Sequence, residues 1–238
     1  MAIGKDVINL QTVIGYTFFD ISYLECALTH SSYTNEQRLK GIKAPSNERL
    51  EFFGDAILQF VVSEYLYSNF TKYREGALTK MRQQLVCEKT LAKIAAEINI
   101  GDYINIGHGE EMTGCRKRPK ILADALEALI AAVYLDSVSH GSADYKSVVV
   151  SIFEKEITAL STKQRTDYKT MLQQLAEQDG TTVLEYRVVE ESGPEHKKTF
   201  KVEAFMNNNK VGEGTAHTKK QAEMEAAKMA LSLFGVSV

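Results

Sequence analysis

Three carboxylates lie close together in the otherwise apolar segment NERLEFFGDAIL. If this segment is an α-helix, with about 100° between successive residues, Glu51 lies about 60° from Glu48, and Asp55 lies about 20° from it. The three acids therefore share one side of the helix. Leu58 and Val62 return to that side, where a solvated helix face would stay polar. We therefore expect the acids to line an inner wall that opens to solvent only near one end.

A second run, ILADALEALIAAVYL over residues 121–135, has Asp124 and Glu127 as its only charges, and no Lys or Arg lies within it. Burying an unpaired carboxylate costs on the order of several kcal/mol unless it takes up a proton, pairs with a cation or binds a metal. Two such helices can supply oxygen ligands to one hard cation, for which Mg²⁺ is the natural candidate. That metal would activate water and stabilise charge on a phosphodiester. Alternatively, the acids pair with arginines, Arg49 and Arg82 being candidates.

The elements that would position these acids are helical. Apolar residues recur at intervals of three and four in the segments 24–30, 48–70, 77–98 and 121–135. Strand-like alternation is scarce in this part of the chain. We therefore predict an all-α domain over residues 1–157, followed by a polar linker over residues 158–166.

The rest of the chain changes character. A helical segment at 168–178 precedes three strand candidates and a closing helix, and turn residues separate the strands. The strand candidates are LEYRVVEES, KTFKVEAFM and KVGEGTA, and the closing helix is KKQAEMEAAKMALSLF. This α-β-β-β-α order predicts a small α+β domain over residues 167–238.

Composition narrows the class of protein. The 238 residues are 44% hydrophobic and 25% charged, as in globular proteins with one or two domains. No apolar run approaches the ~20 residues that cross a membrane, and no signal peptide is evident. Cys26, Cys87 and Cys115 are too widely spaced for a zinc site and suit a reducing cytoplasm. The net charge of −3 means that any nucleic-acid contact must use local basic patches.

These segments resemble the ribonuclease III family of bacteria. NERLEFFGDAIL carries the resemblance, which continues through GYTFFDISYLECALTHSSY, REGALTKMRQQLV, GHGEEMTG and RPKILADALEALIAAVYLD. Further on, DYKTMLQQL, EYRVVEESGPEHKKTFKVEA and GEGTAHTKKQAEMEAAKMAL resemble the family's double-stranded RNA-binding domain. Nearly the whole chain is covered, and we expect an all-α endonuclease domain followed by the α-β-β-β-α domain.

The resemblance implies a homodimeric endonuclease that hydrolyses both strands of double-stranded RNA with Mg²⁺, for which Mn²⁺ is a plausible substitute. The products would carry 5′-phosphate and 3′-hydroxyl ends with short 3′ overhangs, and ribosomal RNA precursors and other structured transcripts would be substrates. We expect no small-molecule cofactor and no membrane partner. The implied metal ligands are Glu51, Asp55, Asp124 and Glu127, with Asp55 and Glu127 as catalytic residues, Glu48 and Glu75 in support, and Phe52 as a candidate subunit contact.

The small domain would read the shape of duplex RNA, whose shallow minor groove presents 2′-hydroxyls. By resemblance, its first helix enters one minor groove, a turn reaches the next, and the last helix meets phosphates with its N-terminus. The implied contacts are Thr170, Gln173, Gln174, Glu177, His196, Lys219 and Lys220. On charge alone these lysines would be ordinary solvated ones, because residues 167–238 hold 9 Lys and Arg against 11 Asp and Glu.

One loop departs from the family pattern, which often has two glycines where this chain has Gly114 and Cys115. The tolerance of the loop for positive φ would therefore differ at Cys115. The following cations either form a solvated loop or contact phosphate; they are Arg116, Lys117, Arg118 and Lys120.

Two other classes of function remain to be separated from a nuclease of duplex RNA. The first is a regulator that binds duplex RNA without cutting it, and the second is a metal-dependent deoxyribonuclease. All four implied ligands are present, which favours cleavage over binding alone, and the RNA-type domain argues against DNA.

Overall fold

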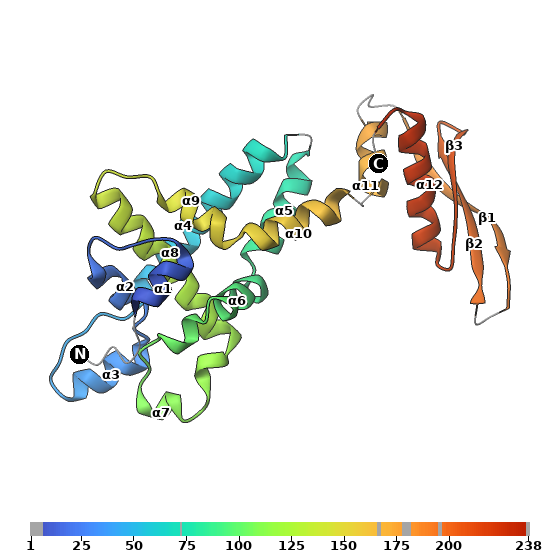
Figure 1. Ribbon diagram of the computed structural model, residues 1–238. Helices are drawn as coiled ribbons and strands as arrows, with labels where there is room; N and C mark the ends of the chain where they lie inside the picture. Colours follow the sequence, from blue (N-terminus) through green and yellow to red (C-terminus); the bar gives the residue numbers. More distant parts are fainter. Residues whose placement is uncertain (1–6, 72, 166–167, 178–181, 195–196, 237–238) are drawn as a thin grey trace. The chain divides into compact units, whose positions relative to one another are not determined.

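The computed structural model describes residues 7–71, 73–165, 168–177, 182–194 and 197–236 (Figure 1). The chain divides into two compact units, Met1–Thr158 and Ala159–Val238. The described part of the first unit is helical, and the second combines two helices with a three-stranded sheet. The predicted order of an all-α domain and a small α-β-β-β-α domain is confirmed. In the described residues, no helix is long and apolar enough to span a membrane.

The first unit is built from short helices around two long ones. The α-helices are α1 (Val7–Ile14), α2 (Ile21–Ala27), α3 (Ser31–Leu39), α4 (Glu48–Asn69), α5 (Glu75–Val86), α6 (Glu88–Glu97), α7 (His108–Glu111), α8 (Pro119–Ser139), α9 (Tyr145–Ile152) and α10 (Glu154–Arg165), with 3₁₀ turns η1 (Ile100–Asp102) and η2 (Cys115–Lys117). Helix α8 is the central element, because it packs against α2, α4 and α6.

Two sequence-based boundaries differ from the structure. The segment 77–98 is divided at Cys87, whose extended backbone (ψ 151°) ends α5 and begins α6. Periodicity does not detect this break, because both helices keep their apolar residues three and four apart. Residues 158–165, expected to form a polar linker, continue α10.

Helices α4 and α8 cross in close contact at Gly54. A Cβ atom on Gly54 would lie 1.9 Å from the main-chain carbonyl oxygen of Glu127, well inside contact distance. Around the crossing, Leu58 of α4 and Leu126 and Leu129 of α8 are fully buried. The glycine therefore allows the two backbones to approach to a distance that no other residue permits.

The C-terminal part of α8 is held by a buried carboxylate that the sequence-based prediction missed. Asp136 is fully buried and accepts hydrogen bonds from the Tyr16 hydroxyl (2.8 Å) and the main-chain N–H groups of Phe19 and Asp20 (both 2.9 Å). Burial, followed by the hydrogen bond and charge of Asp136, raises the pKa of Tyr16 well above its ordinary value. These bonds tie α8 to the loop before α2, and they satisfy a charge whose isolated burial would be costly.

The second unit packs two helices against a sheet of order β1-β2-β3. Its elements are α11 (Tyr168–Glu177), β1 (Leu184–Ser192), β2 (Thr199–Met206), β3 (Asn209–Ala216) and α12 (Lys219–Leu233). All neighbouring strands are antiparallel. Cβ atoms on Gly212 and Gly214 would lie 2.3 Å from the carbonyl oxygens of Ala226 and Ala222. Glycine in β3 and alanine in α12 thus let helix and sheet approach closely.

Replacing Gly54 with alanine tests the crossing of α4 and α8. We expect Gly54→Ala to lower the free energy of unfolding of the helical unit by about 3 kcal/mol or more, because the helices must separate to admit the methyl group. Calorimetry of the full chain measures this as a lower melting temperature.

Gly76→Ala is the matched control, since Gly76 lies in α5 with no atom within 4 Å of an added Cβ. We expect it to be neutral or stabilising by up to about 1 kcal/mol, because alanine favours helix. Equal stability of the two variants would contradict the close approach.

Candidate metal centre and RNA-binding surface

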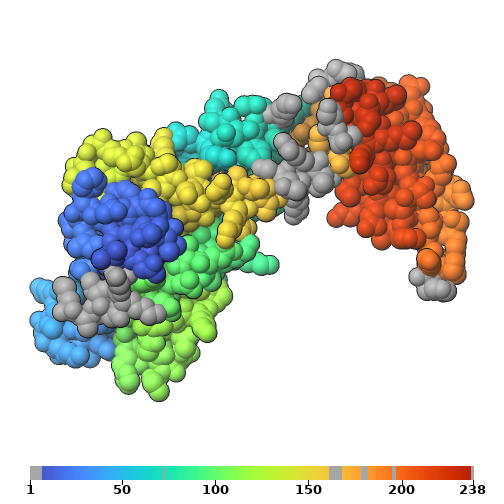
Figure 2. All heavy atoms as spheres, viewed as in Figure 1, coloured from blue at the N-terminus to red at the C-terminus, as the bar shows by residue number. Residues whose placement is uncertain are grey.

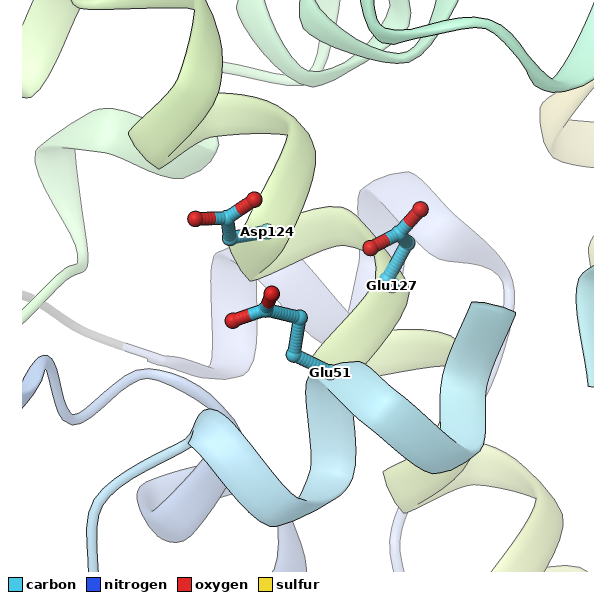
Figure 3. A group of neighbouring side chains, drawn as sticks. All are labelled: Glu51, Asp124 and Glu127. Carbon is cyan, nitrogen blue, oxygen red and sulfur yellow. The ribbon is translucent and has the colours of Figure 1, made fainter. Parts of the chain in front are cut away.

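Three of the predicted acids converge beside the crossing of α4 and α8. Carboxylate oxygens of Glu51, Asp124 and Glu127 all lie within 4.8 Å of one another, and each residue is partly buried. Figure 3 shows Glu51 extending from one helix toward Asp124 and Glu127 on the other. Their positions follow from the helical period, because Asp124 and Glu127 are three residues apart on α8.

The cluster holds more negative charge than its surroundings compensate. The pKa of Glu127 is raised to about 7, first by burial and then by the charges of Asp55, Asp124 and Glu51. Burial and the charge of Asp124 also raise the pKa of Glu51. A half-buried group of carboxylates in which Glu51 and Glu127 resist ionisation is a site prepared for a cation.

One lysine partly offsets this charge. Lys120 Nζ lies 3.0 Å from Asp124 Oδ2, and its charge also opposes the raised pKa values of Glu51 and Glu127. The absence of a cation from the run that starts at residue 121 was therefore misleading. Because α8 begins at Pro119, it includes Lys120 four residues before Asp124, a standard spacing for helical ion pairs.

The arginine alternative receives little support from Arg82, whose Nη1 donates to Ser63 Oγ at 3.1 Å. Lys120 is largely exposed, at 72% of its side-chain surface, so its pair with Asp124 is a weak one. The group of three carboxylates offers the oxygen ligands that Mg²⁺ and Mn²⁺ take. The residues present therefore fit a hard divalent cation.

The remaining predicted acids lie outside this group of three. Both Asp55 oxygens accept hydrogen bonds of 3.0 Å from Gln59 Nε2, although the charge of Asp55 still acts on Glu127. Glu48 accepts from Ser46 Oγ at 3.0 Å. Gln59 is a neighbour that the sequence-based prediction missed, yet its spacing of four from Asp55 could have indicated it.

Glu75 is placed elsewhere. It begins α5, where its Oε1 accepts from Thr79 Oγ1 at 2.8 Å. Helix α5 runs back along α4, since Arg82 contacts Ser63. Glu75 therefore lies near the far end of α4, roughly 27 Å along the helix axis from Glu51 at about 1.5 Å per residue.

Two cations of the basic loop before α8 are paired with nearby acids. Arg116 forms an ion pair with Glu111 (2.6 Å) and donates to the carbonyl oxygens of Gly101 and Ile104. Arg118 pairs with Glu110 at 2.6 Å. Neither guanidinium is a simple solvated group, and Lys117 is left as the exposed cation of η2.

The departure at Cys115 does not strain this loop. The left-handed conformation falls on Gly114, with φ 69°, and Cys115 is not among the described residues with positive φ. Cys115 is fully buried, and burial raises the pKa of its thiol. The side chain fills core space and is protected from reaction.

The first helix of the small unit presents the predicted polar side. Leu172 and Ala176 are buried. By helical spacing, Thr170, Gln174 and Glu177 lie on the other side of α11, and Gln173 lies at the edge of that side. Gln173 and Glu177 are exposed there, joined by a hydrogen bond of 2.9 Å. The predicted contacts are Thr170, Gln173, Gln174 and Glu177.

The two lysines at the start of α12 are not equivalent. Lys219 Nζ lies 2.7 Å from Glu191 Oε1 and also sits over the ring of Phe200. Lys220 has no carboxylate within ion-pair distance among the residues that the structure describes. The helix is capped by Thr218, whose hydroxyl accepts from Gln221 N–H. His196, the predicted contact in the turn after β1, lies outside the described residues.

Comparison with known proteins identifies relatives of this chain. A family described as "Ribonuclease-III-like" matches residues 20–157, and a "Double-stranded RNA binding motif" matches residues 168–233. Ribonuclease 3 of Listeria monocytogenes is 40% identical over 94% of this chain and 96% of its own, and that of Enterococcus faecalis is 44% identical over 94% and 95%. The crystal structure of the nuclease domain of ribonuclease III from Campylobacter jejuni is 41% identical, covering 64% of this chain and 96% of its own, with a TM-score of 0.56.

The raised pKa of Glu127 predicts how stability depends on pH in the absence of metal. The folded pKa of about 7 exceeds the ordinary value of 4.5, so the stabilising effect of the bound proton is complete below pH 4.5 and is lost as the pH rises through 7. We expect Glu127→Gln to raise the free energy of unfolding at pH 8 by about 2–3 kcal/mol, at about 1.4 kcal/mol for each pKa unit. At pH 5 it should change little.

Thermal unfolding in EDTA at the two pH values provides the measurement. Glu154→Gln is the control, because Glu154 is an exposed residue of α10 and its replacement should give the same small change at both. A Glu127→Gln effect that does not depend on pH would show that the carboxylate is not buried against its neighbours.

Proposed function

This chain belongs to the ribonuclease III family, and we propose that it cuts both strands of double-stranded RNA by Mg²⁺-dependent hydrolysis. It is a ribonuclease III-type endoribonuclease that acts on double-stranded RNA. The proposal concerns the metal, the residues that hold it, the products and the assembly. The observation that carries it is the convergence of Glu51, Asp124 and Glu127 in one half-buried group.

Glu51, Asp124 and Glu127 would hold the cation, with Asp55 as a fourth ligand. Mg²⁺, or Mn²⁺ in its place, would supply an activated water and stabilise charge on the phosphodiester. Because the pKa of Glu127 is about 7, its carboxylate loses its proton near neutral pH. It can then act as a ligand in the pH range where an RNA backbone is stable. Asp55 would have to leave Gln59 to join the set. Glu48 supports the site through its charge, which acts on Glu51.

We infer a homodimer, since cutting two strands at once needs two such sites. Phe52, Phe60 and Tyr67 are exposed by 81%, 54% and 77%, and helical spacing puts them within about 80° of one another along α4. Such a long apolar stripe fits a protein interface. The nuclease domain of ribonuclease III from Campylobacter jejuni has a region involved in dimer formation. In a dimer, Glu75 would act at the interface or at the partner's site. A monomeric mass in solution would contradict the homodimer.

The proposed products carry 5′-phosphate and 3′-hydroxyl ends with short 3′ overhangs. Ribosomal RNA precursors and other structured transcripts are the proposed substrates. We place the activity in the cytoplasm, which suits three free cysteines at Cys26, Cys87 and Cys115. The RNA contacts are proposed to be the polar side of α11, His196 and the two lysines that begin α12.

A hairpin RNA of defined sequence tests this function. We expect cleavage of both strands with Mg²⁺ and none with EDTA, and mapping of the fragment ends should find 5′-phosphates. Glu127→Gln should lower the cleavage rate by about a hundredfold or more, because loss of a ligand costs at least as much as loss of its supporting neighbours. Its affinity for the hairpin, measured in EDTA, should be unchanged.

Glu154→Gln is again the control and should cleave at the normal rate. Near-normal turnover by Glu127→Gln would exclude this residue as a ligand. Cleavage of duplex DNA but not RNA would favour the deoxyribonuclease alternative, and binding without cleavage of either would favour the regulator.

The lysines at the start of α12 predict a salt effect. We expect Lys219→Ala with Lys220→Ala to weaken duplex RNA binding by about three- to tenfold and to lower the slope of log affinity against log salt by up to about 1.8, at about 0.9 for each phosphate contact. Lys220 should account for most of the loss, because Lys219 must first leave Glu191.

Lys201→Ala with Lys210→Ala is the matched control, since it removes the same charge from lysines that pair with Glu203 and Glu213. Equal slopes for the two double variants would exclude a phosphate contact at the start of α12. The slopes are measured by fluorescence anisotropy of a labelled duplex in EDTA.

A further inference from the structure

A groove of about 480 Å³ lies on the helical unit between α3 and the segment that leads into α4. It is lined by Thr34, Asn35 and Arg38 of α3 and by residues 42–45. Its walls carry two cations, a hydroxyl and an amide, but no carboxylate. In Figure 2 the light-blue region that includes α3 forms part of the surface beside green α7. Hydrogen bonds from Gly107 N–H to Ser32 and from Gly109 N–H to Glu36 hold α3 to that region.

The charge around this groove is uncompensated. Arg38, Lys40 and Lys43 occur within six residues, and residues 37–47 contain no Asp or Glu. In the part of the chain that the structure describes, neither Arg38 nor Lys43 has a carboxylate within ion-pair distance. All three cations are exposed. This local excess of three positive charges is easily overlooked in a chain whose net charge is −3.

Several cations elsewhere on the helical unit are already committed to acids. Lys93 pairs with Glu156, Lys146 with Glu64, and Lys155 with Glu97. Arg116, Arg118 and Lys120 are likewise paired. An incoming anion would have to break these pairs, whereas the groove offers its charges directly. Bidentate Arg38 and the point charge of Lys43 together suit phosphate oxygens.

The groove is close to the acid cluster. Two extended residues and one helical turn separate Pro45 from Glu51, so their Cα atoms are at most about 13 Å apart, and those of Lys43 and Glu51 at most about 20 Å. A nucleic-acid duplex carries roughly one negative charge per 1.7 Å of axis, so such a span holds about a dozen phosphates. A duplex whose scissile bond lies at the acids therefore has phosphates within reach of the groove.

We propose that this groove is a phosphate-binding site in which Arg38 and Lys43 hold the RNA backbone beside the acid cluster. The inference rests on the proposed function and adds a contact on the helical unit to those of the small unit. The site is indifferent to base sequence, because it meets only the backbone. The groove offsets the repulsion between the acids and the RNA. Among the described residues, Lys120 is the one cation at the acid cluster that also relieves this repulsion.

Binding of a labelled RNA duplex to the full chain in EDTA tests the site without cleavage. We expect Arg38→Ala with Lys43→Ala to weaken binding about three- to tenfold and to lower the salt slope by up to about 1.8. In Mg²⁺ the same variant should raise KM by a similar factor and leave kcat nearly unchanged, as for a contact kept throughout the reaction. The exchange Arg38→Lys with Lys43→Arg should restore most of the affinity.

Lys93→Ala with Lys155→Ala is the matched control, because it removes the same charge from another part of the helical unit. Affinity and slope equal to those of this control would overturn the site. The unmodified chain is assayed in parallel: if it fails to bind or cut duplex RNA, the proposed function fails, and if only the groove variant is indistinguishable from the control, the groove alone is rejected. Circular dichroism verifies that each variant is folded.

Discussion

The close approach of α4 and α8 at Gly54 is the constraint on which the helical unit depends. Because the carbonyl of Glu127 occupies the space where a Cβ would be, the two backbones lie close enough for side chains on either flank to meet. Glu51, one turn before Gly54, thereby faces Asp124 and Glu127. A larger residue at this position would separate the acids as well as the helices. The glycine at position 54 thus determines both the packing of the core and the geometry of the site.

The same approach imposes an electrostatic cost. Carboxylates forced together beside a dry helix crossing resist ionisation, as the raised pKa values of Glu51 and Glu127 indicate. Lys120 relieves only part of this cost, because it is largely exposed. Asp136 is the contrasting case on the same helix, since three hydrogen bonds satisfy it completely. The hydrogen-bonded Asp136 anchors α8, whereas the crowded acids near the start of the helix are suited to holding a cation.

Helical period was sufficient to predict that acids of two helices lie on inner faces, because it depends only on local spacing, whereas the choice between a metal site and arginine pairs rested on the family resemblance. The period placed Glu51 and Asp124 on inner faces, and the alternation of the last 70 residues located every strand. Helical period and strand alternation could not supply the tertiary contacts or the exact ends of the helices. The pair between Lys219 and Glu191 depends on a contact between α12 and β1. The break at Cys87 falls between two helices that keep the same apolar spacing. Lys120 was missed for a simpler reason, since the helix begins two residues before the apolar run.

Neither unit holds more Lys and Arg than Asp and Glu, so contact with RNA depends on where the unpaired cations lie. At the start of α12, Lys220 is the better candidate, because Lys219 is engaged by Glu191. On the helical unit, the uncompensated segment from Arg38 to Lys43 has the corresponding property. A cation that is paired with an acid attracts nucleic acid less, since breaking the pair reduces the gain from a new phosphate contact. On the helical unit, a duplex that reaches Arg38 and Lys43 also extends to the acids that would cut it.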